Sequence, residues 1–177
     1  MRCWQLESEL ENLRGSGYDK RPVSPQTPLR FGYNCIAYAA GDTNVRWWPH
    51  LNKFQFYWPP HLPRQPLNQE TLENFIHAFE WKGYKKCRNG KFKKGIEKVA
   101  IFINPSTKTP THAARQLASG VWTSKCGNLE DIQHETLAAV EGNTYGKVVC
   151  FLNRRIDGKP FWKDRICAWF KRLFSKS

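Results

Sequence analysis

The chain of 177 residues carries 28 Lys and Arg against 15 Asp and Glu, which gives a formal net charge of +13. Hydrophobic residues make up 40% and charged residues 24% of the chain, so the composition excludes a collagen-like repeat, a coiled coil and a wholly disordered protein. Because the length suits one domain, and no apolar run resembles a secretion signal or a membrane span, we expect a cytoplasmic protein with no transmembrane segment.

The first part of the chain predicts short helices separated by irregular segments. Residues 1–14 are expected to form an N-terminal helical segment. Residues 15–33 are rich in Pro and Gly without a sustained hydrophobic period, which is typical of an irregular lead-in. The run Ile-Ala-Tyr-Ala-Ala at 36–40 predicts a helical turn, and it places Cys35 at the N-terminus of that helix. Residues 46–67 combine prolines with aromatic residues and predict a packed aromatic loop.

The middle of the chain shows the clearest periodic patterns. Apolar side chains recur at helical spacing over 69–81, which predicts an amphipathic helix with Asn68 as its N-cap. The Ala-Ser-Gly connection at 118–120 is short enough to close a hairpin. We expect residues 15–155 to form one α+β domain in which the early helix packs on an antiparallel β-sheet. The runs that predict its strands lie near 98–104, 111–117, 121–125 and 146–155.

Two basic segments make polyanions candidate partners. Residues 156–177 predict a C-terminal amphipathic helix with an aromatic face and a basic face. A second basic cluster precedes the first long predicted strand. Its members are Lys85, Lys86, Arg88, Lys91, Lys93 and Lys94. Such runs are usually solvated faces, but their density makes contact with nucleic acid or an anionic surface a reasonable expectation.

Cys35 and His112 form the candidate catalytic pair. The positive end of a helix dipole favours the thiolate, and a neighbouring imidazole exchanges the proton. Ser124 follows His112 by twelve residues on the second arm of the predicted hairpin, so a near-opposite pairing brings its hydroxyl to the imidazole. We therefore predict that Ser124 orients His112, with His134 and Asp131 as the alternatives.

An oxyanion formed at this site needs hydrogen-bond donors. The backbone N–H of Cys35 is available at the helix start, and Asn34 or Gln26 is the candidate side-chain donor. Each residue also has a purely structural interpretation, because free Cys is among the most buried residue types and Ser124 suits a turn. Lys125 is expected to be solvated.

Several motifs resemble an uncharacterised microbial domain family over about residues 17–155. They read Asn-Cys-Ile-Ala-x-Ala-x-Gly-Asp at 34–42, Thr-His-x-Ala-x-Gln-Leu at 111–117 and Trp-x-Ser-Lys-x-Gly at 122–127. The resemblance implies a scaffold without an assigned reaction, whose Cys and His motifs fall on Cys35 and His112. The layout is also similar to that of NlpC-type cysteine hydrolases, which implies a papain-like fold. Ser124 stands where such enzymes usually carry His, Asn or Gln.

The leading hypothesis is a papain-like cysteine hydrolase or acyl transferase that acts on a peptide, amide or thioester substrate. It needs no cofactor. A metal site is not expected, because His50, His61 and His77 have no Cys or His partner at metal-ligand spacing. The alternative is a noncatalytic basic module that binds nucleic acid or another polyanionic partner.

Overall fold

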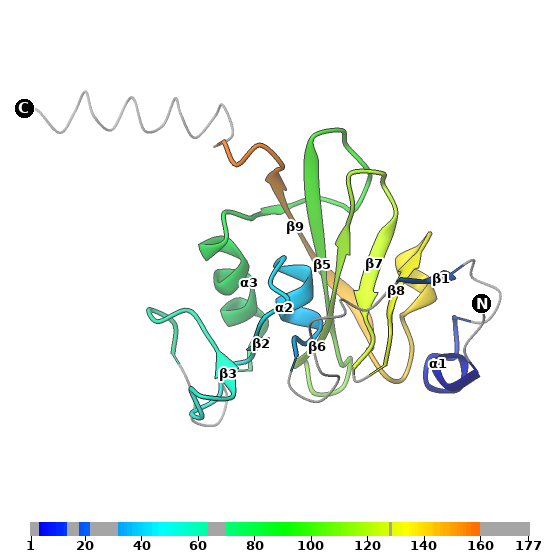
Figure 1. The fold of residues 1–177 in the computed structure, drawn as a ribbon, viewed down its shortest axis with the longest axis horizontal. Coiled ribbons are helices and arrows are strands. Elements are labelled where there is room, and N and C mark those ends of the chain that lie inside the picture. The colour runs from blue at the N-terminus through cyan, green and yellow to red at the C-terminus, as the bar shows by residue number, and fades with distance from the viewer. Residues whose placement is uncertain (1–3, 14–17, 22–31, 64–69, 128, 160–177) are drawn as a thin grey trace, which may run out of the picture.

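A computed structural model describes residues 4–13, 18–21, 32–63, 70–127 and 129–159 (Figure 1). In this part of the chain, a seven-stranded sheet runs in the order β1-β8-β7-β6-β5-β9-β4, and every neighbouring pair is antiparallel. Its strands are β1 (Tyr18–Arg21), β4 (Lys85–Cys87), β5 (Ile96–Ile103), β6 (Pro110–Gln116), β7 (Trp122–Lys125), β8 (Asp131–His134) and β9 (Lys147–Arg155). Two further strands, β2 (Arg46–Trp47) and β3 (Phe56–Tyr57), pair in parallel apart from it.

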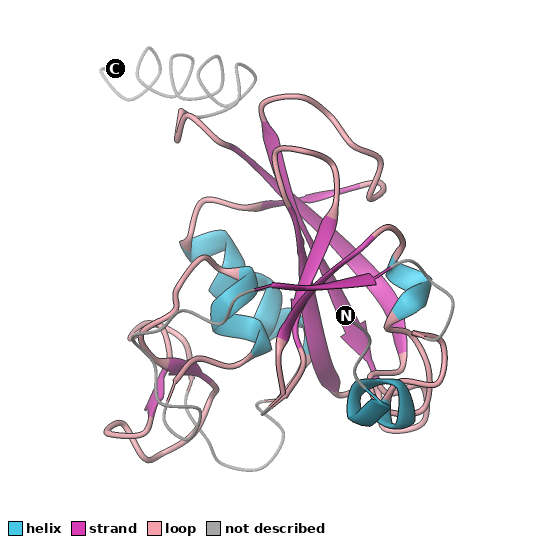
Figure 2. Cartoon of the chain, turned by 45° about the vertical axis from the view of Figure 1, so that its right-hand side comes forward, coloured by secondary structure: helices cyan, strands magenta, loops and turns pink. Residues whose placement is uncertain are grey.

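Helices cover both faces of the sheet (Figures 1 and 2). The helices α2 (Cys35–Ala39) and α3 (Leu72–Trp81) lie on one face, and α1 (Trp4–Glu9) lies on the other. A short 3-10 helix spans Leu137–Ala139. None of the helices in the described ranges has both the length and the apolar content needed to cross a membrane.

The sheet separates two hydrophobic clusters. The first cluster joins α2 and α3 to the sheet through residues such as Ile36, Phe75 and Ile101. The second contains Leu6 of α1 and Phe102 of the sheet. β5 contributes successive side chains to the two clusters in turn and is buried along its whole length. A strand covered on both faces loses the alternation of polar and apolar residues, which explains the continuous apolar run from Val99 to Ile103.

The predicted α+β class and its main elements are confirmed. The helix expected at 36–40 is α2, and the strands expected near 98–104, 111–117, 121–125 and 146–155 are β5, β6, β7 and β9. The 118–120 connection joins β6 to β7 as an antiparallel pair. Sequence patterns therefore located the elements that form the centre of the sheet.

Three expectations about boundaries need correction. The helix predicted over 69–81 begins at Leu72, because the Thr71 side chain accepts a hydrogen bond from the Asn74 N–H and caps it. The N-cap is therefore Thr71 rather than Asn68. The lead-in expected to be irregular contains β1, and the aromatic loop at 46–67 contains β2 and β3.

Some expectations fall where the structure tests little or nothing. Residues 160–177 lie outside the described residues, so the basic C-terminal helix stays a prediction. The division into segments 1–14, 15–155 and 156–177 also stays a prediction, as does the cytoplasmic location. Leu6, Leu10 and Leu13 of the first segment do pack in the second hydrophobic cluster, against the sheet.

Candidate active site

Asn34 positions Cys35 by capping α2. Its Oδ1 accepts hydrogen bonds from the N–H groups of Ala37 and Trp47, both at 3.1 Å. Its Nδ2 donates to the Trp47 carbonyl at 2.9 Å. One side chain therefore satisfies a free amide of the first helical turn and joins that turn to β2. These bonds fix the point at which Cys35 begins the helix.

The Cys35 thiol lies against the backbone of β6. The ladder between β6 and β7 ends at the Ala114–Ser124 pair, so the preceding residues of β6 have no partner in β7. The Cys35 Sγ is 3.9 Å from the Thr111 carbonyl oxygen, to which the thiol donates. The Ala113 N–H also faces the sulfur. The thiol is thus held by the two residues that flank His112.

His112 projects from the opposite face of the sheet. Cys35 and Ala113 pack in the cluster with α2 and α3, whereas the His112 ring stacks on Tyr145, with 4.0 Å between ring centroids. The Phe102 and His112 rings pack in a T-shaped arrangement, with 5.2 Å between their centroids. Among the described residues no hydrogen bond joins the Cys35 thiol to His112, and the thiol is bonded to the Thr111 carbonyl.

A chain of buried hydrogen bonds sets the protonation of His112. The His134 Nδ1 lies 2.7 Å from the Thr136 carbonyl, which only accepts, so Nδ1 carries the proton of neutral His134. The His134 Nε2 must then accept from the Ser124 hydroxyl at 3.0 Å. Ser124 in turn accepts from the His112 Nε2, also at 3.0 Å. This leaves the His112 Nδ1 without a proton, buried and without a partner among the described residues.

Burial keeps both members of the candidate pair neutral. It raises the pKa of the Cys35 thiol to about 11, although the Ala113 N–H and the charge of Lys125 act in the opposite direction. Burial lowers the pKa of His112 to about 3 and that of His134 to about 4. The resting site near pH 7 therefore holds a thiol and an imidazole rather than a thiolate–imidazolium pair.

The structure brings Ser124 and His134 together with His112 but directs Asp131 elsewhere. Asp131 accepts a hydrogen bond from the Tyr33 hydroxyl at 2.5 Å and lies 3.8 Å from the Lys125 ammonium. These contacts are on the α2 side of the sheet, away from the imidazole. Ser124 and His134 therefore act in series, rather than as alternatives, in the bonding of His112.

The structure describes only one of the two side chains predicted to donate a hydrogen bond to an oxyanion. The Asn34 amide is used in the α2 cap and in the bonds to Trp47. Gln26 lies outside the described residues. A role for either in binding an oxyanion stays a prediction.

Lys125 is a site residue that sequence reasoning missed. It was expected to be solvated, but its side chain is only 7% exposed. Its ammonium bonds to the Leu129 carbonyl and lies over the Tyr33 ring, 5.7 Å from the centroid. The sequence signal for its burial is its position directly after Ser124 in a strand. Because successive side chains of a strand point to opposite faces, Lys125 must lie on the face that α2 covers.

Tyr145 and Cys126 are also close to the candidate pair. The Tyr145 ring stacks on His112, and its hydroxyl is hydrogen-bonded to the Cys126 thiol. Burial, together with the neighbouring Cys35, raises the pKa of Cys126 to about 12, although the charge of Lys125 acts in the opposite direction. The Thr111 hydroxyl donates to the Tyr145 carbonyl at 2.5 Å, which fixes this segment against β6. No spacing in the sequence links residues so far apart along the chain.

The predicted polyanion-binding residues lie on the surface around β4 and the loop that follows it. The Lys86 ammonium pairs with Glu73 at 3.1 Å. Lys85, Arg88, Lys91, Lys93 and Lys94 are exposed. Lys98, in the same basic run, is instead buried and donates to the Asn89 carbonyl at 2.7 Å. Binding of nucleic acid by this cluster stays a prediction.

Comparison with known proteins identifies a family but no assigned reaction. No curated protein and no solved structure matches the chain. Residues 24–153 match a family described as a domain of unknown function, DUF7689. The matched span includes every residue of the hydrogen-bond chain from His112 to Thr136, and Cys35 as well. The chain therefore belongs to the DUF7689 family.

Proposed function

We propose that this protein is a cysteine hydrolase or acyl transferase in which Cys35 is the nucleophile and His112 is the general base. One observation carries the proposal: the hydrogen-bond chain through Ser124 and His134 leaves a bare, buried nitrogen on His112. A buried polar atom without a partner costs free energy, so such an arrangement is typical of a functional site. The thiol is held by the two neighbours of that histidine.

In the resting structure the Cys35 thiol donates to the Thr111 carbonyl and is not bonded to His112. Attack in this proposal therefore begins with rotation of the thiol away from that carbonyl and towards the His112 Nδ1, beside the part of β6 that has no partner in β7. Because both groups are neutral at rest, proton transfer accompanies attack. The Cys35 thiol gives its proton to the His112 Nδ1 as the sulfur bonds to the carbonyl carbon of an amide or thioester, and the carbonyl electron pair moves to oxygen. When the oxygen electron pair re-forms the carbonyl, the bond to the leaving amine or thiol breaks, and His112 returns the proton to that group. Water or an amine then cleaves the acyl-enzyme in the same way and restores the thiol.

Ser124 and His134 act as positioning residues in this proposal. Because the Ser124 oxygen accepts from Nε2 of His112, the imidazole is held in the tautomer that exposes Nδ1 as a base. The papain-like layout inferred from the sequence assigns the same function to a polar third residue on the neighbouring strand. In this proposal the third residue is Ser124, whose hydroxyl is itself hydrogen-bonded to the His134 imidazole.

The test is acylation of Cys35 by a small activated thioester, followed by peptide mapping with mass spectrometry. We expect acylation of Cys35 near pH 7, and a rate about a hundredfold lower in His112→Gln, because general-base catalysis contributes about 10²–10⁴-fold. Ser124→Ala removes one hydroxyl and should also slow acylation while leaving the bulk of the site in place. Circular dichroism verifies the fold of each variant.

Cys87 provides the matched control, since it is a partly exposed thiol on β4, far from His112 in the sequence and in the sheet order. Cys87→Ala should leave acylation of Cys35 unchanged. The proposal is wrong if Cys35 in the unaltered protein reacts no faster than Cys87, or if folded Ser124→Ala and His112→Gln both react at the original rate.

A further inference from the structure

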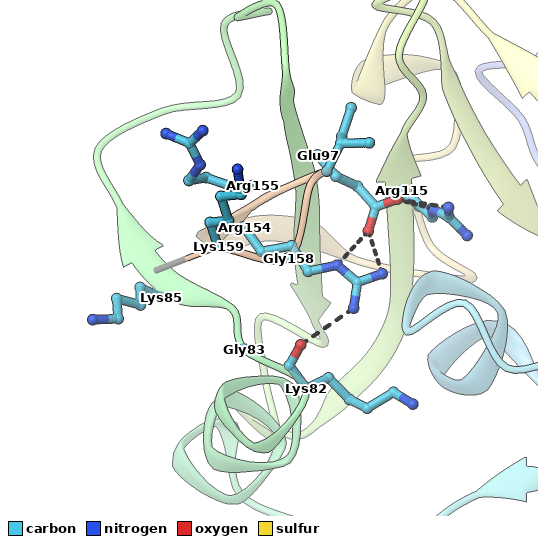
Figure 3. A pocket seen from close by; sticks show the side chains of 10 residues that line it. Lys82, Gly83, Lys85, Glu97, Arg115, Arg154, Arg155, Gly158 and Lys159 are labelled. Carbon is cyan, nitrogen blue, oxygen red and sulfur yellow. Dashed lines mark hydrogen bonds and ion pairs between the residues drawn. The ribbon is translucent and has the colours of Figure 1, made fainter. Parts of the chain in front are cut away.

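A basic pocket of about 590 Å³ lies between the end of α3 and the end of β9 (Figure 3). None of its lining residues belongs to the candidate active site. Its volume is within the range of small-molecule sites, roughly 300–1,000 Å³. Six cationic side chains line it, namely Lys82, Lys85, Arg115, Arg154, Arg155 and Lys159.

Glu97 holds two of the arginines in fixed positions. The Arg115 Nε and Nη2 lie 2.7 and 2.6 Å from Oε2 of Glu97. The Arg154 Nε and Nη2 lie 2.9 and 2.8 Å from Oε1. The Tyr84 hydroxyl bonds to the same carboxylate, and the Arg154 guanidinium stacks 4.4 Å from the centroid of the Tyr84 ring. Arg154 also donates to the Lys82 carbonyl at 3.2 Å, as Figure 3 shows.

The pocket retains a large excess of positive charge after these pairs are counted. Among the residues that the structure describes, Glu97 is the one carboxylate that lines the pocket, and Asp157 pairs with Arg155 at 2.6 Å. Six positive charges against these two negative charges leave an excess of four. The side chains of Arg115 and Arg154 remain 28% and 27% exposed, and both line the pocket.

We propose that this pocket binds an oligophosphate, either free or as part of a nucleotide. A compact anion with several charges matches the excess, whereas a monocarboxylate would neutralise one charge. Rigid guanidinium groups bind phosphate oxygens in a defined geometry and lose little entropy on binding. A nucleic acid strand instead distributes its charges along a groove, and this positive charge is gathered in one hollow. The exposed Ile156 adds an apolar wall beside it.

The test uses inorganic tripolyphosphate and ATP as probes in isothermal titration calorimetry at about 50 mM and about 300 mM NaCl. Lys85→Gln/Lys159→Gln removes two lining charges but keeps the Glu97–Arg115–Arg154 contacts. We expect this double variant to bind tripolyphosphate about tenfold more weakly than the unaltered protein. The matched control, Lys108→Gln/Lys147→Gln, removes the same charge at the opposite end of the sheet, where Lys147 begins the strand that ends at Arg155. It should change the affinity by less than about twofold, because surface charges beyond about 10 Å are screened.

Tighter binding of ATP than of tripolyphosphate identifies the ligand as a nucleotide, and equal binding identifies the free oligophosphate; both results support the site. Three results overturn it. The first is no binding of either probe at low salt. The second is an equal loss of affinity in the two double variants. The third is binding of a single-stranded RNA that both double variants weaken alike, which would indicate a diffuse basic surface rather than a pocket.

Discussion

Glu97 is the residue on which the polar contacts of the basic pocket converge. Its buried carboxylate accepts from Arg115, Arg154 and Tyr84. Glu97→Gln keeps the shape of the side chain but leaves two guanidinium groups facing each other without a counter-charge. Breaking a buried pair of this kind is strongly destabilising, so we expect the free energy of unfolding to fall by about 3 kcal/mol. Urea denaturation followed by circular dichroism measures this change.

Glu73 is the matched control for that substitution. It is 59% exposed and pairs with Lys86 on the surface. Glu73→Gln should change the free energy of unfolding by less than about 1 kcal/mol, as is usual for exposed ion pairs. Equal losses from Glu97→Gln and Glu73→Gln would show that the buried carboxylate does not organise the arginines.

Contacts of single residues were predicted correctly where the register between two neighbouring strands determines them. The separation of twelve residues from His112 to Ser124 predicted both side chains on one face of a hairpin, and the structure places the His112 Nε2 3.0 Å from the Ser124 hydroxyl. Lys125 was placed wrongly, because exposure depends on whether a second layer covers the other face of the strand. Tyr145 was not identified as a site residue, since its stacking on His112 depends on packing between distant segments.

The helix α2 depends on one polar side chain. The Asn34 side chain accepts two hydrogen bonds at Oδ1 and donates one from Nδ2, whereas the α3 cap Thr71 accepts a single bond of 3.3 Å from the Asn74 N–H. Loss of an N-cap costs about 0.5–2 kcal/mol, and here the bonds to Trp47 are lost as well. We expect Asn34→Ala to destabilise the protein by about 2 kcal/mol, more than the roughly 1 kcal/mol for Thr71→Ala. Chemical denaturation of both variants checks the order.

Acylation of Cys35 gives a second readout for the Asn34 cap. If the cap positions the thiol, Asn34→Ala should slow acylation of Cys35 under conditions where the variant is still folded. Thr71→Ala, which alters a helix that does not carry the thiol, should leave that rate unchanged. A stability loss for Asn34→Ala no greater than that for Thr71→Ala would contradict the dominant contribution of the cap.

Sequence patterns predicted the elements that are long or buried and missed those that are polar or very short. β5 and α3 were found because each shows a sustained apolar run or a helical period. β1 reads Tyr-Asp-Lys-Arg and has no apolar alternation, so it forms only because its backbone pairs with β8 at the sheet edge. β2 and β3 each span two residues, which is too short for any periodic signal.

At the scale of the whole molecule, the sheet is covered on both faces, and this arrangement places ionisable groups in the interior. The two hydrophobic clusters enclose it, and His112 and His134 lie buried on the face that α1 covers. A sequence with five histidines does not indicate which of them are buried, because burial here follows from the packing of α1 and the Tyr145 segment onto the sheet. The hydrogen-bond chain is therefore a product of the tertiary fold.

Burial of these two histidines makes the stability of the protein depend on pH. Their pKa values are about 3 and about 4 in the folded protein, compared with about 6.5 in an unfolded chain. Below pH 6.5 the unfolded chain takes up protons that the folded protein does not, so stability is complete above that pH and falls as the solution is acidified towards the folded pKa values. Each histidine should lower the free energy of unfolding by up to about 2 kcal/mol between pH 7 and pH 5.

Urea denaturation at pH 7, 6 and 5 measures this loss, in a range where most carboxylates remain ionised. His134→Gln should remove about half of the pH dependence, because one of the two buried imidazoles is gone. His77→Gln is the substitution control, because this histidine lies on α3 with a side chain that is 44% exposed and is not part of the buried hydrogen-bond chain. Stability that is equal at pH 7 and pH 5 would mean that His112 and His134 take up protons within the folded protein. At pH 5 the site would then hold an imidazolium in place of the neutral imidazole that the proposed proton transfer from Cys35 requires.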